Sequence, residues 1–260
     1  MCAAMRMLNR DGVHLAVEDV GSSEPALLFA HAWSADHTFF APQVAHFADR
    51  HRVVNVDLRG HGASDAPEGD YTMESFAEDL AWIADSLGLH RPAVVGHSMG
   101  GIIALALCAM YPESARAVVL LDAPLLPSPP LLAAMPELLH GMESPAFREV
   151  TRQFQGQFVG FAGDETRRGR ILDVLASGPQ HVKVSSLRHV FDSDHASWAA
   201  ACKLPVLYVG SGGGFADVER LMTLCPQLRV TQTTGSGHFH QLEVPDQVNT
   251  AIEDFLATLD

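Results

Sequence analysis

The sequence predicts an α/β fold in which a mostly parallel sheet is flanked by helices. Short runs rich in Val, Leu and Ile alternate with longer helical runs along most of the 260 residues. This alternation is typical of parallel strands joined by crossover helices. Residues 124–201 break the rhythm, because no strand pattern occurs there. We therefore expect one sheet-based core, 1–123 and 202–260, with a helical insertion at 124–201.

The predicted elements of the core follow from hydrophobic periodicity. In the helix expected at 73–87, Phe76, Leu80 and Ile83 recur at steps of three and four residues, which places them on one face. A second amphipathic helix is expected at 245–259, with Pro245 in its first turn. The predicted strands are 14–20, 26–31, 52–57, 92–96, 117–121, 205–210 and 228–233.

The insertion opens with a cluster of prolines between Pro124 and Pro136. Helices are expected after it, at 145–159, 164–176 and 180–190. Such a segment would form a cap over the carboxyl edge of the sheet and one wall of a pocket. The aromatic candidates for that wall are Phe147, Phe154, Phe158 and Phe161. The spacing of these phenylalanines would equally let the helices pack on the core.

Charge and composition exclude several classes of function. The formal net charge of −14 argues against nucleic acid and anionic membranes as partners, because phosphate binding needs clustered Lys and Arg. No apolar run reaches the roughly 18–20 residues that span a bilayer, and no signal segment is expected, so the sequence predicts a cytoplasmic protein. A small-molecule substrate is the expected partner, and the oligomeric state is not predicted.

The cysteines and glycines give no sign of a cofactor. The four cysteines lie far apart in the chain, without a C-x-x-C pair, so we expect reduced thiols instead of disulfides or a metal site. Residues 210–214 are rich in glycine but lack the spacing and the Lys-Ser/Thr ending of a phosphate-binding loop. No cofactor and no metal are therefore expected.

The motif Gly96-His97-Ser98-Met99-Gly100 lies between a predicted strand and a helical run. This context is typical of a nucleophile elbow, in which the glycines permit a sharp turn that exposes the serine hydroxyl. The backbone N–H of Met99 would then point to a developing oxyanion. The second donor is expected from the loop after strand 26–31, at the N–H of Trp33.

A serine nucleophile needs a base to accept its proton. His238 follows small residues after the last predicted strand and is the expected base, with His240 as the competitor. A metal held by these two histidines would need a third ligand that the sequence does not indicate. His31 and His97, which flank the predicted oxyanion loop and the serine, are further candidates for the substrate pocket.

Four motifs in succession resemble the landmarks of the α/β-hydrolase fold. They are His31-Ala32-Trp33, the turn at 57–64, Gly96 to Gly101, and Gly235-Ser236-Gly237-His238. The resemblance covers nearly the whole chain and implies a catalytic triad, although Ala32 stands where the family usually has glycine. It also implies that Arg59, His61 and Ser64 form a structural turn.

The acid of the triad is the member that the resemblance leaves open. Most of the family carries it just after the strand that corresponds to 205–210, where this chain has Ser211 and three glycines. Asp122, after strand 117–121, is the first candidate, since some members keep their acid there. Asp217 is the alternative acid, although it also suits the N-terminus of a helix at 218–224.

These residues predict a serine hydrolase that cleaves an ester or lactone of a small, largely apolar substrate through an acyl-enzyme on Ser98. The alternatives are a cofactor-independent dioxygenase of a hydroxyquinolone, which would use a His238–Asp122 dyad, and a C–C bond hydrolase. The placement of the acid resembles the 3-hydroxy-4-quinolone dioxygenases. A binding protein on a hydrolase scaffold is a further possibility. Relatives with aspartate at the elbow, such as epoxide hydrolases, are disfavoured by Ser98.

Overall fold

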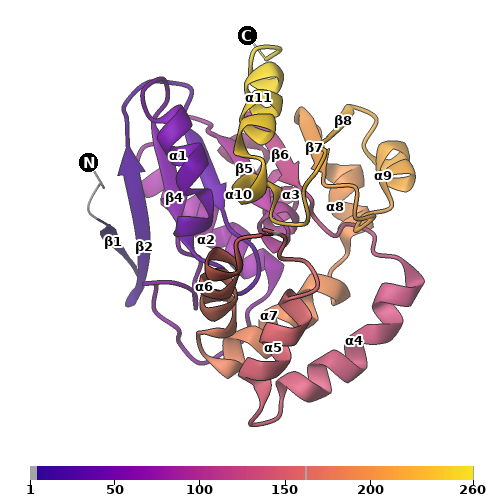
Figure 1. Cartoon of the computed structure of the whole chain (residues 1–260). Coiled ribbons are helices and arrows are strands. Elements are labelled where there is room, and N and C mark those ends of the chain that lie inside the picture. Colours follow the sequence, from indigo (N-terminus) through magenta and orange to yellow (C-terminus); the bar gives the residue numbers. More distant parts are fainter. Residues whose placement is uncertain (1–4, 162, 260) are drawn as a thin grey trace.

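The computed structural model describes residues 5–161 and 163–259. Its centre is an eight-stranded sheet with the order β1-β2-β4-β3-β5-β6-β7-β8 (Figure 1). Strands β3 to β8 run parallel to one another. At one edge of the sheet, β2 pairs antiparallel with both β4 and β1. The predicted fold class is confirmed. The strands are β1 (Arg6–Arg10), β2 (Val13–Val20), β3 (Leu27–Ala30), β4 (Val53–Val56), β5 (Ala93–His97), β6 (Ala117–Leu121), β7 (Val206–Gly210) and β8 (Leu228–Gln232).

The two faces of the sheet are covered by different helices. Successive side chains of a strand point to opposite faces, so Leu28 and Val94 pack against α2 (Met73–Ser86) and α3 (Met99–Met110). Leu27 and Phe29 pack on the other side, against α1 (Ala41–Phe47) and α11 (Pro245–Leu256). Both faces of the central strands are therefore buried, as their continuous apolar runs require.

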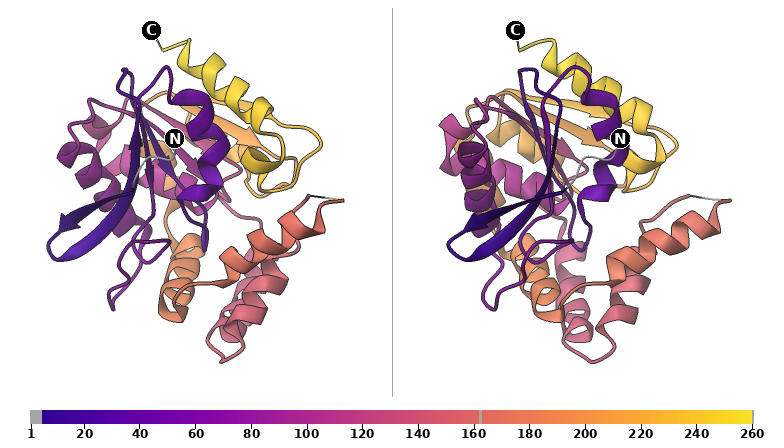
Figure 2. Two further views of the ribbon diagram at one scale, coloured as in Figure 1. Left: turned by 60° about the vertical axis from the view of Figure 1, so that its left-hand side comes forward. Right: turned by 90° about the vertical axis from the view of Figure 1, so that its left-hand side faces the viewer.

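Helices from the insertion lie together beyond one edge of the sheet. Both views in Figure 2 show them below the core. They are α4 (Pro129–Met142), α5 (Phe147–Gln155), α6 (Glu165–Ala176) and α7 (Gln180–Asp192), which we call the cap helices. The first of them was not predicted, because its prolines suggested a loop. Pro129 occupies the first turn, where a missing N–H is tolerated, and Pro136 lies inside the helix.

The boundary of the insertion differs from the prediction at its end. Helix α8 (His195–Ala201) falls within the predicted insertion but packs beside α3 of the core. The chain has therefore returned to the core before residue 201. The remaining short elements are η1 (His37–Phe40), η2 (Pro112–Ser114), α9 (Val218–Leu224) and α10 (His240–Glu243). Among the described residues, no helix combines the length and the apolar character that crossing a membrane requires.

A disulfide joins Cys108 of α3 to Cys202 at the end of α8. The expectation of reduced thiols was wrong for this pair. The two cysteines are 94 residues apart in the chain, and the packing of α8 on α3 brings their Cα atoms to 5.6 Å. Cys225 is buried as a free thiol, and Cys2 lies outside the described residues.

Candidate active site

Ser98 sits at a strained turn between β5 and α3. Its backbone has φ 53° and ψ −117°, a conformation that residues other than glycine rarely adopt. A Cβ on Gly96 would lie 2.1 Å from the carbonyl oxygen of Gly100, and a Cβ on Gly100 would lie 2.0 Å from that of Ala30. Only glycine fits at both positions, which explains the motif. The turn leaves Ser98 partly exposed at the wall of a cavity.

His238 and Asp122 are joined by a hydrogen bond at the bottom of this site. Asp122 directly follows β6, and its Oδ2 accepts a hydrogen bond from Nδ1 of His238 at 2.7 Å. Both side chains are buried, but His238 borders the same cavity as Ser98. The structure thus places the predicted base in contact with the first acid candidate, and the base and the predicted serine on the wall of one cavity.

Ser211 donates hydrogen bonds to both oxygens of the Asp122 carboxylate. Its backbone N–H donates to Oδ1 at 2.9 Å, and its hydroxyl donates to Oδ2 at 2.6 Å. Burial raises the pKa of Asp122, but the hydrogen bonds from His238 and Ser211 outweigh it and lower that pKa overall. Asp122 is therefore a carboxylate that can orient the imidazole. The sequence analysis missed this role, although Ser211 stands where the family usually carries its acid.

The alternative acid lies elsewhere. Asp217 is exposed, and its carboxylate accepts the backbone N–H of Arg220 at 3.0 Å as the N-cap of α9. It has no hydrogen bond to His238 among the described residues. Asp217 thus has the role in helix capping that its sequence position also suggested.

His97 and His240 are buried away from the cavity, so His97 does not line the pocket as predicted. His97 Nε2 donates to the carbonyl oxygen of His238 at 2.8 Å, and its Nδ1 accepts from the side chain of Gln241 at 3.0 Å. Burial keeps the pKa of His97 well below its usual value and lowers that of His240 to about 4. Both rings are neutral, and His97 supports the loop that carries the base.

The two predicted oxyanion donors border the cavity. Met99 is the first residue of α3, so its N–H has no partner within the helix. Trp33 lies in the loop after β3, and among the described residues its backbone N–H has no acceptor. Unpaired N–H groups of two residues that line one cavity could stabilise a developing oxyanion there.

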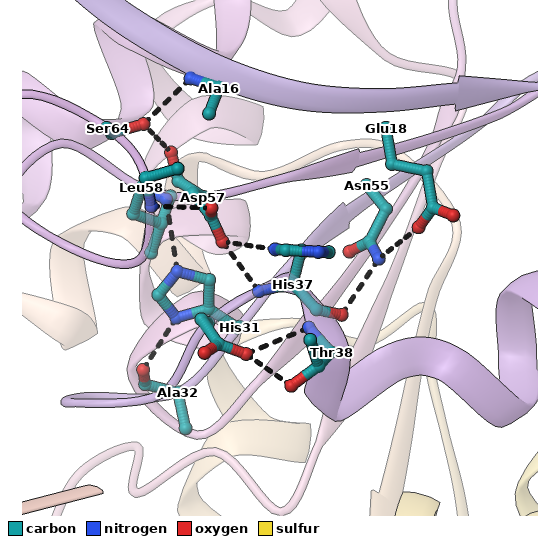
Figure 3. Close-up of polar contacts among 12 residues, drawn as sticks. Ala16, Glu18, His31, Ala32, His37, Thr38, Asn55, Asp57, Leu58 and Ser64 are labelled. Atoms are coloured by element: carbon teal, nitrogen blue, oxygen red, sulfur yellow. Dashed lines mark hydrogen bonds and ion pairs between the residues drawn. The ribbon is translucent and has the colours of Figure 1, made fainter. Parts of the chain in front are cut away.

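The loop that carries Trp33 is anchored by buried polar residues (Figure 3). His31 Nδ1 donates to the carbonyl oxygen of Ala32 at 2.8 Å, and its Nε2 accepts from the N–H of Leu58 at 3.0 Å. Burial lowers the pKa of His31, and the neutral ring suits one donor and one acceptor. His31 therefore does not line the pocket, which corrects the prediction, and instead holds the start of the loop.

Asp57 anchors the far end of the same loop. Its Oδ1 accepts the backbone N–H of His37 at 2.7 Å and the ring Nδ1–H at 2.8 Å (Figure 3). Its Oδ2 accepts the N–H of Ala63 at 2.9 Å, and Ser64 donates to its carbonyl oxygen at 2.6 Å. The turn at 57–64 thus supports the oxyanion loop and lies outside the cavity, in agreement with a structural role.

The cavity itself is small and mostly apolar, with a volume of about 60 Å³. Phe154 and Phe158 line it as predicted, whereas Phe147 and Phe161 do not, because they lie outside the part of the cap that faces Ser98. Phe215 was missed, and its ring centre is 4.6 Å from that of His238. The other lining residues include Ala32, Pro124, Leu131, Gln155, Leu187, Val190, Phe191 and Phe239.

No three His, Cys, Asp or Glu side chains in residues 5–161 and 163–259 gather in an arrangement that could hold a metal ion. The imidazole of His238 has Asp122 as its partner, and His240 Nδ1 lies 3.1 Å from the hydroxyl of Thr233.

Comparison with known proteins places these features in a family. A model of the alpha/beta hydrolase fold matches residues 25–245. The chain is similar to 2-(acetamidomethylene)succinate hydrolase of Mesorhizobium japonicum, with 36% identity over 110 residues, which are 42% of this chain and 39% of that protein. The matched part thus spans less than half of that relative.

Two solved structures share the fold over nearly the whole chain. The enol-lactonase of Burkholderia xenovorans LB400 superposes with a TM-score of 0.86 at 22% identity, covering 97% of this chain and all of that one. A variant of AqdC in complex with the Pseudomonas quinolone signal superposes with a TM-score of 0.83 at 22% identity, covering 98% and 100%. At 22% identity these two similarities show the fold alone. The chain belongs to the alpha/beta hydrolase fold family.

Proposed function

We propose that this protein hydrolyses carboxylic esters or lactones of small, largely apolar substrates through an acyl-enzyme on Ser98. The proposal depends on one observation: His238 is hydrogen-bonded to Asp122 and lines the same cavity as Ser98. The apolar lining suits an aliphatic or aromatic acyl group, because burial of such a group is favourable and leaves no polar atom unpaired.

In the first half of the reaction, Ser98 Oγ attacks the carbonyl carbon while His238 Nε2 accepts its proton. Asp122 stabilises the imidazolium and holds its Nδ1–H. The N–H groups of Trp33 and Met99 receive the oxyanion. The bond between the carbonyl carbon and the leaving oxygen then breaks, and His238 returns the proton to that oxygen.

In the second half, His238 takes a proton from water, which attacks the acyl carbon. The second tetrahedral intermediate uses the same two N–H donors. When it collapses, the proton on His238 returns to Ser98 Oγ, and the carboxylic acid leaves. For a lactone the leaving alcohol belongs to the same molecule, so a hydroxy acid is released.

Two names among the similar proteins support this class of substrate. The Burkholderia xenovorans structure is called an enol-lactonase, and a 3-oxoadipate enol-lactonase of Acinetobacter baylyi is 24% identical over 89% of this chain. These names describe those proteins. Here they favour the cleavage of a C–O bond next to a carbonyl, which the site around Ser98 is suited to perform.

The test combines covalent labelling with a substrate panel. A fluorophosphonate probe should label wild type and leave Ser98→Ala unlabelled, because only an activated hydroxyl reacts. A panel of p-nitrophenyl esters of increasing acyl length, together with γ- and δ-lactones, should show turnover in wild type alone. Absence of both labelling and turnover in folded wild type would refute the proposal and favour a binding protein on a hydrolase scaffold.

The position of Asp122 favours a second candidate, cofactor-independent oxygenolytic ring cleavage of a hydroxyquinolone. The acid follows β6 here, as in the dioxygenases that the sequence resembles, and one solved structure with this fold describes ring cleavage of the Pseudomonas quinolone signal by an AqdC variant. In this reaction the His238–Asp122 pair would take a proton from the heteroaromatic hydroxyl. Oxygen uptake with a 3-hydroxy-4-quinolone, lost under nitrogen, would support it, whereas ester turnover is unaffected by the removal of air.

A further inference from the structure

A buried lysine of the cap contacts the oxyanion loop. Lys183 of α7 is one of only two lysines in the sequence and is 2% exposed. Among the described residues, it forms no ion pair with a carboxylate. Burying an amine is costly unless its N–H groups are hydrogen-bonded. The hydrogen-bond partners of the Lys183 amine therefore indicate its role.

Lys183 makes contacts with two consecutive residues of the loop after β3. Its Nζ donates to the hydroxyl of Ser34 at 2.7 Å, and its own carbonyl oxygen accepts the indole N–H of Trp33 at 3.1 Å. The Nζ also lies 5.4 Å from the centre of the Trp33 ring. A second hydrogen bond, to the carbonyl oxygen of Leu175 at 2.7 Å, connects the same amine to α6.

The middle part of the loop is a tight turn, closed by the hydrogen bond from the N–H of Ala35 to the carbonyl oxygen of Ala32 at 3.1 Å. His31 and Asp57 anchor the start and the far end (Figure 3). Between these anchors, Ser34 has φ 64°, in the left-handed region that residues other than glycine rarely occupy. Trp33 and Ser34 are the two central residues of this turn. A shift of the turn would therefore move the oxyanion donor.

We infer that Lys183 is a positioning residue, which holds the Trp33 N–H in place for the oxyanion and so makes catalysis depend on the docked cap. The inference rests on the proposed function, because it assigns the Trp33 N–H to the oxyanion hole. Lys183 itself does not border the cavity that contains Ser98. It acts through Ser34 and Trp33.

The protonation state of the amine is compatible with this role. Burial, with a smaller effect of Arg148, lowers the pKa of Lys183 to about 7. A neutral amine has two N–H groups, and Lys183 has two acceptors, Ser34 Oγ and Leu175 O. Both hydrogen bonds therefore survive the loss of the charge.

The test compares Lys183→Met with Lys203→Met. Lys203 is the other lysine and is exposed. Among the described residues its amine donates a hydrogen bond to the carbonyl oxygen of Ala200 alone, so it is a matched control. Lys183→Met should lower kcat for a p-nitrophenyl ester about 10- to 100-fold, less than the roughly 10²–10³-fold typical of losing an oxyanion donor, with KM changed by less than about twofold. The affinity for an alkylboronic acid, which forms a tetrahedral adduct with Ser98, should fall in parallel.

A second variant keeps the test decisive if Lys183→Met folds poorly. Ser34→Ala removes the acceptor and leaves the lysine in place, and it should lower kcat and boronate affinity together. In the double variant the two losses should not multiply, because they break the same hydrogen bond. Far-ultraviolet circular dichroism checks that each variant is folded.

The outcomes separate the two proposals. Unchanged kcat and boronate affinity in Ser34→Ala, or a raised KM with unchanged boronate affinity in folded Lys183→Met, would overturn the positioning role while leaving the hydrolase intact. Wild type that neither turns over esters nor reacts with fluorophosphonate would instead overturn the proposed function, and the role of Lys183 with it.

Discussion

The hydroxyl of Ser211 donates a hydrogen bond to Oδ2 of Asp122 at 2.6 Å, the same oxygen that accepts from His238. The serine follows β7, and the aspartate follows the neighbouring strand β6. The place where relatives usually carry the acid therefore holds a donor to an acid from the next strand. The carboxylate is thus oriented from two sides.

Asp122→Asn should nearly abolish hydrolysis. An asparagine keeps the shape but cannot stabilise the imidazolium, and the corresponding change in a well-studied serine protease lowers kcat roughly 10⁴-fold. Steady-state kinetics with p-nitrophenyl esters gives the measurement. Asp217→Asn is the matched control and should retain activity close to that of wild type. The reverse pattern would assign the acid to Asp217.

Ser211→Ala should weaken catalysis and shift its pH dependence. Removal of this donor raises the pKa of Asp122, which the hydrogen bonds from His238 and Ser211 now lower. Without this donor the carboxylate is protonated at a higher pH than in wild type, so the loss of activity that accompanies protonation of Asp122, on the acid limb of the pH profile, begins at higher pH. A hydrogen bond to a charged group contributes about 1.5–3 kcal/mol, so a loss of roughly tenfold or more is expected.

The control for this variant is Ser211→Thr, which keeps a hydroxyl group. It should retain the acid limb of wild type if the hydrogen bond is what matters. An acid limb that stays in place in Ser211→Ala would show that Ser211 does not support the acid.

Lys183 should make the stability of the fold depend on pH in the alkaline range. Its pKa is about 7 in the folded protein against an ordinary value of 10.5, because burial lowers it, with a smaller effect of Arg148. Between these values the unfolded chain binds the extra proton, so the free energy of unfolding rises with pH, by up to about 1.4 kcal/mol per pH unit. The penalty is fully present below pH 7 and disappears as the pH rises through 10.5.

Urea denaturation at several pH values measures this effect. Wild type and Lys203→Met should show the rise, and Lys183→Met should show a flatter dependence between pH 7 and 10. If the free energy of unfolding changed with pH in the same way in all three proteins, the Lys183 amine would have the same pKa in the folded and the unfolded chain.

Loss of the disulfide should lower the stability of the whole molecule. The bond between Cys108 and Cys202 spans 94 residues. Disulfides typically stabilise a fold by about 2–4 kcal/mol, and more for longer loops. The double variant Cys108→Ala, Cys202→Ala should unfold at lower urea concentration than wild type. Dithiothreitol should lower the midpoint of wild type and leave that of the variant unchanged.

Thiol titration in denaturant without reductant provides an independent check. Wild type has four cysteines, of which Cys108 and Cys202 should not react. Reaction of all four would contradict the disulfide and restore the expectation of reduced thiols.

The sequence predicted the elements whose signal is local. The apolar runs of β3 to β7 and the glycine motif from Gly96 to Gly100 can be recognised from short stretches of the sequence. Strand β1 escaped notice because only Leu8 of its five residues is buried, so it has no apolar run. Helix α4 was missed because its prolines, which suggest a loop, are accommodated in a helix.

The relationships that were missed depend on distant parts of the chain. Nothing local distinguishes Lys183 from the exposed Lys203, and its burial becomes visible only when α7 packs on the loop at Trp33. The choice between Asp122 and Asp217 likewise required knowing which carboxylate meets His238. Sequence reasoning also placed His31 and His97 in the pocket because they neighbour it in the chain, whereas both side chains point into the protein.

The bond between Cys108 and Cys202 has a consequence for how the enzyme tolerates proteases. It joins α3, which precedes the cap, to the end of α8, which follows the cap, so the cap helices belong to a covalently closed ring. A single cleavage in any cap loop would open this ring without releasing a fragment. The nicked chain would remain one molecule, with the serine on one side of the cut and the histidine on the other still tethered.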